Sequence, residues 1–98
     1  MVQREIKWSH NALNDKLSIF EFWFEKYRSV EYPLRLEDEF YQITQLLREF
    51  CDLGKLFPES NNRFILKDHF QIIYTINDEY IEILHIWDTR QNPKNLPL

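Results

Sequence analysis

The sequence predicts an α+β fold in which one strand precedes a helical hairpin and three strands follow it. Two observations predict this class. Apolar residues recur at helical spacing across residues 10–50, and runs rich in aromatic and β-branched residues fill much of 63–87. Because helices and strands are segregated along the chain, we expect the hairpin to pack on one face of a small, mostly antiparallel sheet. A chain of 98 residues fits one domain, 1–98, around one core.

The first strand and the first helix are expected to follow one another directly. Residues 2–8 alternate apolar and polar side chains, apart from Arg4, which is typical of a half-buried strand. Ser9 or Asn11 can cap a helix over residues 10–28. Its apolar residues recur at spacings of four and three, which predicts one buried stripe. The stripe consists of Leu13, Leu17, Phe20, Phe24 and Tyr27.

A second helix is predicted by the same spacing. Pro33 suits its first turn, where the missing N–H costs nothing, and acidic residues at 37–39 lie near its positive dipole end. Its predicted stripe consists of Leu36, Phe40, Ile43, Leu47 and Phe50. The short connection between the helices favours antiparallel packing. Gly54, the only glycine, is expected to supply a left-handed cap after this helix.

Three short strands are predicted over residues 63–66, 69–76 and 80–87. The links between them are short and polar, so a three-stranded meander is the simplest arrangement. The remaining residues, 91–98, contain two prolines and are expected to form an irregular, exposed C-terminal tail.

The charge balance argues against a nucleic-acid binder. Twelve Lys and Arg residues against sixteen Asp and Glu give a net charge of −4, and neither half of the chain is basic. Binding to nucleic acid depends on neutralising phosphates, which calls for a basic face. Folding could still assemble a local basic cluster, for which Arg63 and Arg90 are the candidates.

Cysteine usage and hydropathy indicate where the protein works. Cys51 is the single cysteine, so neither an internal disulfide nor a cysteine-rich metal site is expected, as is usual in a reducing cytoplasm. No apolar run approaches the ~18 residues of a membrane span, and residues 1–10 lack the apolar core of a signal peptide. We therefore expect a cytoplasmic protein that does not associate with membranes.

Motifs for common chemistries are missing from the sequence. One glycine excludes a glycine-rich phosphate loop, and neither a His-Glu-x-x-His zinc motif nor a Gly-x-Ser-x-Gly elbow occurs, so no cofactor or metal is expected. His85 interrupts the apolar run of the last strand and must find a hydrogen-bond partner. A core histidine with a satisfied ring is the more frequent explanation, and a catalytic histidine is the alternative.

Two aromatic residues of the first helix, Phe22 and Trp23, fall outside its predicted stripe. Either a partner protein or a second copy of the chain covers them, or the sheet of the same chain does. The sequence favours neither alternative.

The element order, Arg63 at the start of its strand, the strand around residues 70–74 and the closing segment 83–93 together resemble the RelE/ParE family of bacterial toxins, also known as plasmid stabilisation proteins. The likeness covers nearly the whole chain. It implies the toxin of a type II toxin–antitoxin pair, which inhibits growth and is neutralised by a cognate antitoxin. RelE-like members cleave mRNA in the ribosome, whereas ParE-like members inhibit DNA gyrase.

If the chain is a nuclease, the resemblance implies a metal-independent endoribonuclease with Arg63 and Arg90 as cations and His85 as acid or base. However, RelE uses two lysines along its second strand, an arginine in the next strand and a tyrosine in its C-terminal tail. This chain has Phe64 and Ile65, then Gln71, and no tyrosine after residue 80. We therefore slightly prefer a gyrase inhibitor. A ribosome-dependent endonuclease is the alternative, and an inactive family member is the third possibility.

Overall fold

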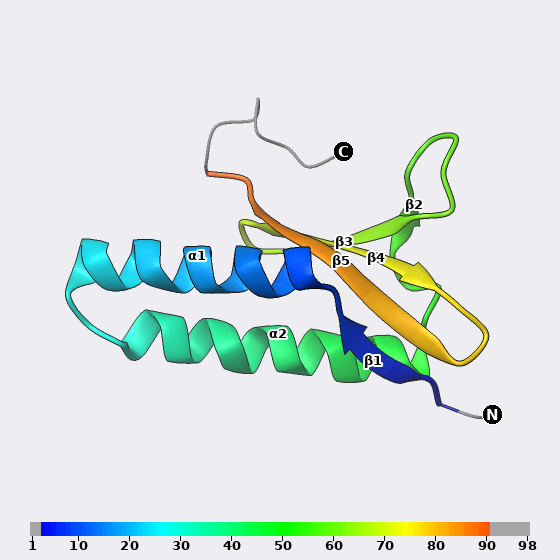
Figure 1. The fold of residues 1–98 in the computed structure, drawn as a ribbon, viewed down its shortest axis with the longest axis horizontal. Helices are drawn as coiled ribbons and strands as arrows, with labels where there is room; N and C mark the ends of the chain where they lie inside the picture. The colour runs from blue at the N-terminus through cyan, green and yellow to red at the C-terminus, as the bar shows by residue number, and fades with distance from the viewer. Residues whose placement is uncertain (1–2, 91–98) are drawn as a thin grey trace.

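The computed structural model describes residues 3–90, and its elements follow the predicted order with one addition (Figure 1). In chain order the elements are β1 (Glu5–Trp8), α1 (His10–Tyr27), α2 (Glu31–Glu49), β2 (Lys55–Leu56), β3 (Arg63–Lys67), β4 (Phe70–Ile76) and β5 (Tyr80–Asp88). The short strand β2 was not expected. The tail predicted at 91–98 lies outside the described residues.

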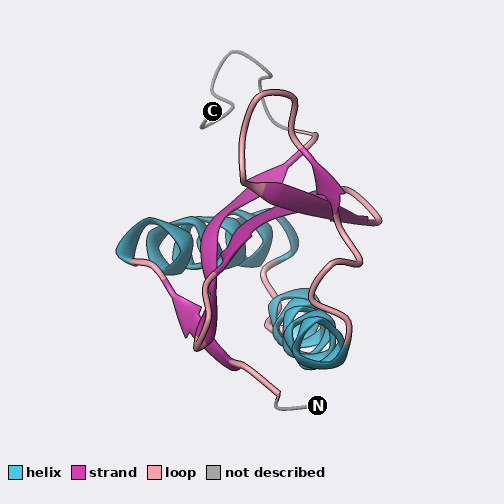
Figure 2. Cartoon of the chain, turned by 90° about the vertical axis from the view of Figure 1, so that its right-hand side faces the viewer, coloured by secondary structure: helices cyan, strands magenta, loops and turns pink. Residues whose placement is uncertain are grey.

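The strands form one five-stranded sheet in the order β1-β5-β4-β3-β2. β1 runs parallel to β5, and the other neighbouring strands are antiparallel. The two helices run side by side in opposite directions (Figure 1), and the sheet curves over α2 (Figure 2). Apolar side chains of both helices and of β4 and β5 meet in one core. The predicted α+β class and the mostly antiparallel sheet are confirmed.

Helix α1 begins as expected but turns a different face to the core. Ser9 is its cap, and the Ser9 hydroxyl accepts a hydrogen bond from Ala12 N at 3.0 Å. The buried residues of α1 are Ala12, Ile19 and Trp23, whereas Leu13, Leu17, Phe24 and Tyr27 of the predicted stripe are exposed and Phe20 is half-buried. The predicted stripe was therefore wrong.

Polar contacts with β5 explain the rotation of α1. Ser9 Oγ donates to the carbonyl of Leu84 at 2.9 Å, and Asp15 Oδ2 accepts from the backbone N–H of Ile86 at 3.0 Å. These contacts place the side of α1 that carries Asp15 against the strand. The buried residues of α1, Ala12, Ile19 and Trp23, therefore lie close to Asp15 around the helix. The face with the most apolar residues does not meet the core.

Helix α2 matches its predicted stripe except at the end. Four of the five predicted residues are buried, namely Leu36, Phe40, Ile43 and Leu47. Pro33 in the first turn and Thr44 are buried as well. Phe50 is 53% exposed, because the helix ends at Glu49 and Phe50 leaves the helical conformation as its C-cap. The ring of Phe40 stacks on Phe20 of α1 at 6.3 Å between centroids, which confirms the antiparallel helical hairpin.

Gly54 does not cap α2, because its φ is not positive and the helix has already ended. Its role is to leave space. Tyr74 Oη donates to the carbonyl of Cys51 at 2.8 Å and accepts from the N–H of Gly54 at 2.8 Å. Burial raises the pKa of this phenol. A Cβ on residue 54 would lie 2.6 Å from Tyr74 Oη and 2.7 Å from the carbonyl oxygen of Phe64.

We predict that Gly54→Ala destabilises the protein by about 1–3 kcal/mol, because the added methyl group overlaps a buried phenol and a strand carbonyl. Urea unfolding of the purified variant measures the change. Leu53→Ala is the control, since Leu53 is 48% exposed and truncation there should change stability by about 0.5 kcal/mol or less. Equal stability of Gly54→Ala and the parent would contradict this steric role.

Candidate functional site

The three residues implied by the nuclease resemblance lie in separate places. Arg63 opens β3 opposite Tyr74, whereas Arg90 follows Asp88, which pairs with Phe70 at the other end of β4. With about 3.3 Å per residue along a strand, these two ends are roughly 13 Å apart. The structure therefore does not bring the two arginines together.

Arg63 is engaged by the loop that follows α2. Its Nη1 atom donates to the carbonyl of Gly54 at 2.8 Å and to the carbonyl of Asp52 at 3.3 Å. Arg63 lies opposite Tyr74, whose hydroxyl bonds to the same loop. The guanidinium group therefore helps to fix the connection between α2 and β2.

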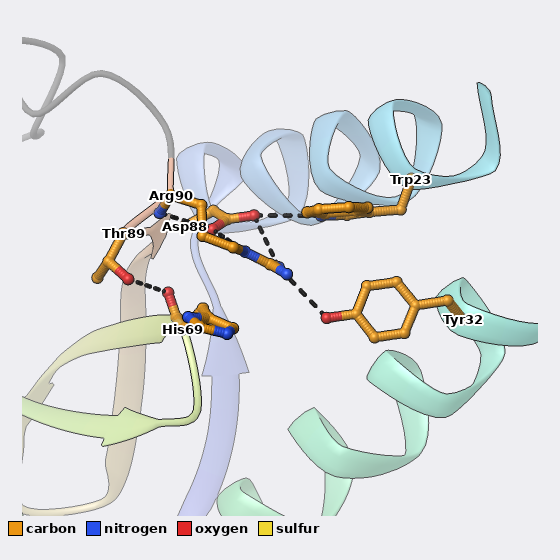
Figure 3. A network of polar contacts seen from close by, with 6 residues as sticks. All are labelled: Trp23, Tyr32, His69, Asp88, Thr89 and Arg90. Atoms are coloured by element: carbon orange, nitrogen blue, oxygen red, sulfur yellow. Dashed lines mark hydrogen bonds and ion pairs between the residues drawn. The ribbon is translucent and has the colours of Figure 1, made fainter. Parts of the chain in front are cut away.

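Arg90 forms an ion pair with the buried carboxylate of Asp88 (Figure 3). Nε of Arg90 donates to Oδ1 at 2.9 Å and Nη2 to Oδ2 at 3.1 Å, so the two planar groups meet along two bonds. Oδ1 also accepts from the Arg90 backbone N–H at 3.0 Å, and Oδ2 accepts from Trp23 Nε1 at 3.1 Å. The side chain of Asp88 is fully buried. Each of its two oxygens therefore accepts two hydrogen bonds, which offset the cost of burying the charge.

Aromatic rings hold the guanidinium of Arg90 in place. It lies 4.0 Å from the ring centroid of Trp23 and 5.2 Å from that of Phe70, and Nη2 donates to Tyr32 Oη at 3.2 Å. Burial lowers the pKa of Arg90, but the hydrogen bonds to Asp88 and Tyr32 and the charge of Asp88 outweigh it, so the pKa is raised. Arg90 is thus a fixed cation that joins the end of β5 to both helices.

The network corrects the prediction for Trp23. This side chain is 5% exposed, because its indole packs in the core and donates to Asp88, so Trp23 cannot form a partner surface. Of the two alternatives, covering by the same chain is the right one for Trp23. Phe22 is 47% exposed and lies edge-on to Trp23 at 4.9 Å. A partner surface at Phe22 stays a prediction.

The ring of His85 is half-buried and has a hydrogen-bond partner at one of its two nitrogens. Its Nδ1 lies 3.1 Å from Asp15 Oδ2, the oxygen that also accepts from the Ile86 N–H. His85 borders a groove of about 500 Å³. No lysine or arginine is among the described residues that line this groove. The described lining of this groove therefore supplies neither a lysine nor an arginine to stabilise a pentavalent phosphate.

A second groove, of about 880 Å³, lies where Arg90 reaches the surface. Cationic and acidic side chains both line it, among them Arg35, Glu31 and Asp68, together with His69. Within residues 3–90, no group of three or more His, Cys, Asp and Glu side chains could hold a metal ion. Neither of the two described helices is long and apolar enough to cross a membrane.

The helices carry an exposed apolar surface, and its residues on α1 were predicted from the sequence to be buried. We call it the helix surface, and it consists of Leu13, Leu17, Phe24, Leu34 and Tyr41, which are between 39% and 65% exposed. Lys16 and Glu37 form an ion pair at 2.7 Å that links the two helices. Large exposed apolar patches are typical of protein interaction sites. The helix surface is therefore the candidate site for a macromolecular partner.

We predict that Arg90→Met lowers the free energy of unfolding by about 3 kcal/mol, because the buried Asp88 carboxylate loses its cation. Adding Asp88→Asn should recover part of the loss, since the buried charge is then removed as well. Arg35→Met is the matched control: Arg35 is an exposed cation 5.0 Å from the ring of Tyr32, and its loss should cost about 1 kcal/mol or less. Thermal or urea unfolding measures all three variants, and a single Arg90→Met variant as stable as Arg35→Met would be inconsistent with this role.

Comparison with known proteins gives a match at the level of structure. No protein-family model matches the sequence, and no curated protein matches it. Among solved structures, the chain is similar to a chain of the "Chromosomal ParDE TA system from P. aeruginosa", with a TM-score of 0.75 and 17% sequence identity. The similarity covers 88% of this chain and 96% of that chain. The chain therefore has the ParE-like fold that the resemblance implied.

Proposed function

We propose that this protein is the toxin of a type II toxin–antitoxin pair, acts in the bacterial cytoplasm by binding a macromolecular target, and is neutralised by a cognate antitoxin. The observation that carries the proposal is the fold, which is similar over 88% of the chain to a member of a ParDE TA (toxin–antitoxin) system. The exposed helix surface supports it, because a toxin needs a face that its antitoxin can cover.

For the target we favour DNA gyrase over mRNA on the ribosome. Arg63 and Arg90 are engaged in contacts at opposite ends of the sheet, and the groove at His85 has no basic side chain among its described residues. A net charge of −4 also opposes approach to the phosphates of a ribosome. These features support a toxin that acts by binding and not by cleaving RNA.

One observation favours the nuclease as the second candidate. Asp15 orients the ring of His85 through Nδ1, as a carboxylate does for a general base. A ribosome-dependent, metal-independent endoribonuclease would use this pair. An inactive member of the family remains the third reading, which an expression experiment separates from the other two.

The helix surface is the proposed antitoxin site, and Phe22, on another side of α1, is proposed as a separate antitoxin contact. An amphipathic helix of the antitoxin could lay its apolar side on such a surface, with Leu13, Leu17 and Phe24 as anchors. A homodimer through the same surface is the competing arrangement. It would hide these residues from the antitoxin, so the two states exclude one another.

We predict that induced expression of the chain stops growth, that the neighbouring small reading frame restores it, and that a DNA-damage reporter rises while translation continues. Incorporation of labelled methionine and the reporter signal, followed in the same culture, measure the two effects. His85→Phe should keep the toxicity, because gyrase binding needs no acid or base there. Loss of translation before any reporter signal, together with a non-toxic His85→Phe variant, would favour the nuclease. Folded protein without a growth defect would favour the inactive member.

We also predict that Phe22→Asp weakens antitoxin binding at least about tenfold while leaving growth inhibition intact, because a charge replaces an exposed apolar anchor. Isothermal titration with the purified antitoxin measures the affinity. Leu66→Asp is the matched control, since Leu66 is 59% exposed on β3, away from the helices. Equal affinities of the two variants would remove Phe22 from the antitoxin site.

A further inference from the structure

The groove beside His85 is separate from the helix surface and from the Arg90 network. It lies where the loop 57–62 approaches the start of α1 and the face of the sheet that carries Ile73 and His85. Ile73 points away from the main core, because Ile72 and Tyr74 on either side of it belong to that core. A groove of about 500 Å³ is of the size that proteins use for small ligands.

A β-bulge aims His85 into this groove. Ile73 pairs with His85 and the next residue, Tyr74, pairs with Ile83, so Leu84 has no partner of its own across the strands. An extra residue in one strand changes which side chains share a face. After the bulge, His85 lies on the face of Ile73, and both line the groove with Leu84.

The chemistry of Asp15 fixes the tautomer of the neutral His85 ring. Asp15 Oδ2 accepts from the N–H of Ile86, so it acts as an acceptor toward Nδ1 of His85 as well. Nδ1 must then carry the hydrogen and donate it. In the neutral ring, Nε2 is left as an acceptor, and it has no hydrogen-bond partner among the described residues. Among the polar groups of the groove, Nε2 of His85 is thus an acceptor whose orientation is fixed by Asp15.

The rest of the groove is apolar or neutral. Phe57, Pro58, Ile73 and Leu84 provide apolar walls, and serine and asparagine side chains complete the lining. No Lys, Arg, Asp or Glu side chain is among the described lining residues. The loop is preformed, because Phe57 N donates to the carbonyl of Asn62 at 2.9 Å and Phe57 packs on Phe64 at 4.7 Å between ring centroids. A charged ligand would lose its hydration here without gaining a partner.

We propose that this groove binds a neutral aromatic group that carries a single hydrogen-bond donor, such as a phenol. The ring fills the space between Phe57 and Leu84, and the hydroxyl donates to Nε2 of His85. The phenol comes either from a free small molecule or from a tyrosine of a polypeptide. This inference does not rest on the proposed toxin function, because every contact in it belongs to the groove itself.

Titration with matched phenols, followed by backbone amide chemical shifts in the full chain, tests the site. We expect p-cresol to shift the amides of Ile73 and Leu84. We expect 4-methylanisole, which keeps the ring but lacks the donor, to bind about tenfold more weakly, which corresponds to one hydrogen bond. Equal affinities for the two ligands, or shifts confined to other parts of the chain, would overturn the proposal.

Two variants locate the acceptor. His85→Phe should bind both ligands equally, because the ring remains and Nε2 is gone, whereas His69→Phe should keep the preference for p-cresol, since His69 lies on the other groove. Retention of the preference in His85→Phe would overturn the assignment of Nε2. If that variant does not fold, the comparison of the two ligands on the parent chain still tests whether the groove accepts a hydrogen bond from the ligand hydroxyl.

N-acetyl-tyrosinamide distinguishes the two sources of the phenol. Binding at least as tight as that of p-cresol, with the same dependence on His85, assigns the groove to a tyrosine of a polypeptide. Binding at least about tenfold weaker than that of p-cresol assigns it to a free phenol. Each outcome supports the site and identifies what fills it.

Discussion

The outer edge of β5 imposes the constraint on which the rest of the structure depends. Backbone N–H and C=O groups along this edge need partners, because unpaired polar groups in a folded chain are costly. β1 pairs only with residues 80–83. Beyond that point α1 takes over with side chains: Ser9 Oγ bonds to the carbonyl of Leu84, and Asp15 bonds to the N–H of Ile86. Side chains at the start of α1 therefore satisfy backbone groups of β5 that a neighbouring strand would otherwise pair.

The contacts of Ser9 and Asp15 with β5 determine which apolar residues of α1 are buried and which are exposed. With Ser9 and Asp15 against β5, Trp23 further along the helix comes within reach of Asp88 at the end of the same strand. Burial of Asp88 requires a cation, and Arg90 supplies it two residues later. The leucines of the predicted stripe are turned outward as a consequence. The same contacts that complete the sheet thus leave an apolar surface for a partner.

The sequence predicted what periodicity and local propensity decide. Four of the five residues in the stripe of α2, the three strands from residue 63 onward and the α+β class were right because each depends on neighbours close in the chain. The face of α1 was wrong because its anchors join residues more than seventy positions apart, Ser9 with Leu84 and Asp15 with Ile86. Gly54 was misread for the same reason: the phenol that requires its missing Cβ lies twenty positions away.

A candidate site residue can act on a ligand only through hydrogen-bonding groups that the fold has not already engaged. Arg63 is committed to two loop carbonyls, and Arg90 is committed to Asp88 and Tyr32. The loop carbonyls that engage Arg63 cannot be read from the sequence, whereas Asp88, two residues before Arg90, is a partner that the sequence offers. His85 differs, because Asp15 occupies Nδ1 and so defines what Nε2 offers to a groove. Chemistry toward a ligand is therefore best placed at that one nitrogen, and contact with a protein partner at the helix surface.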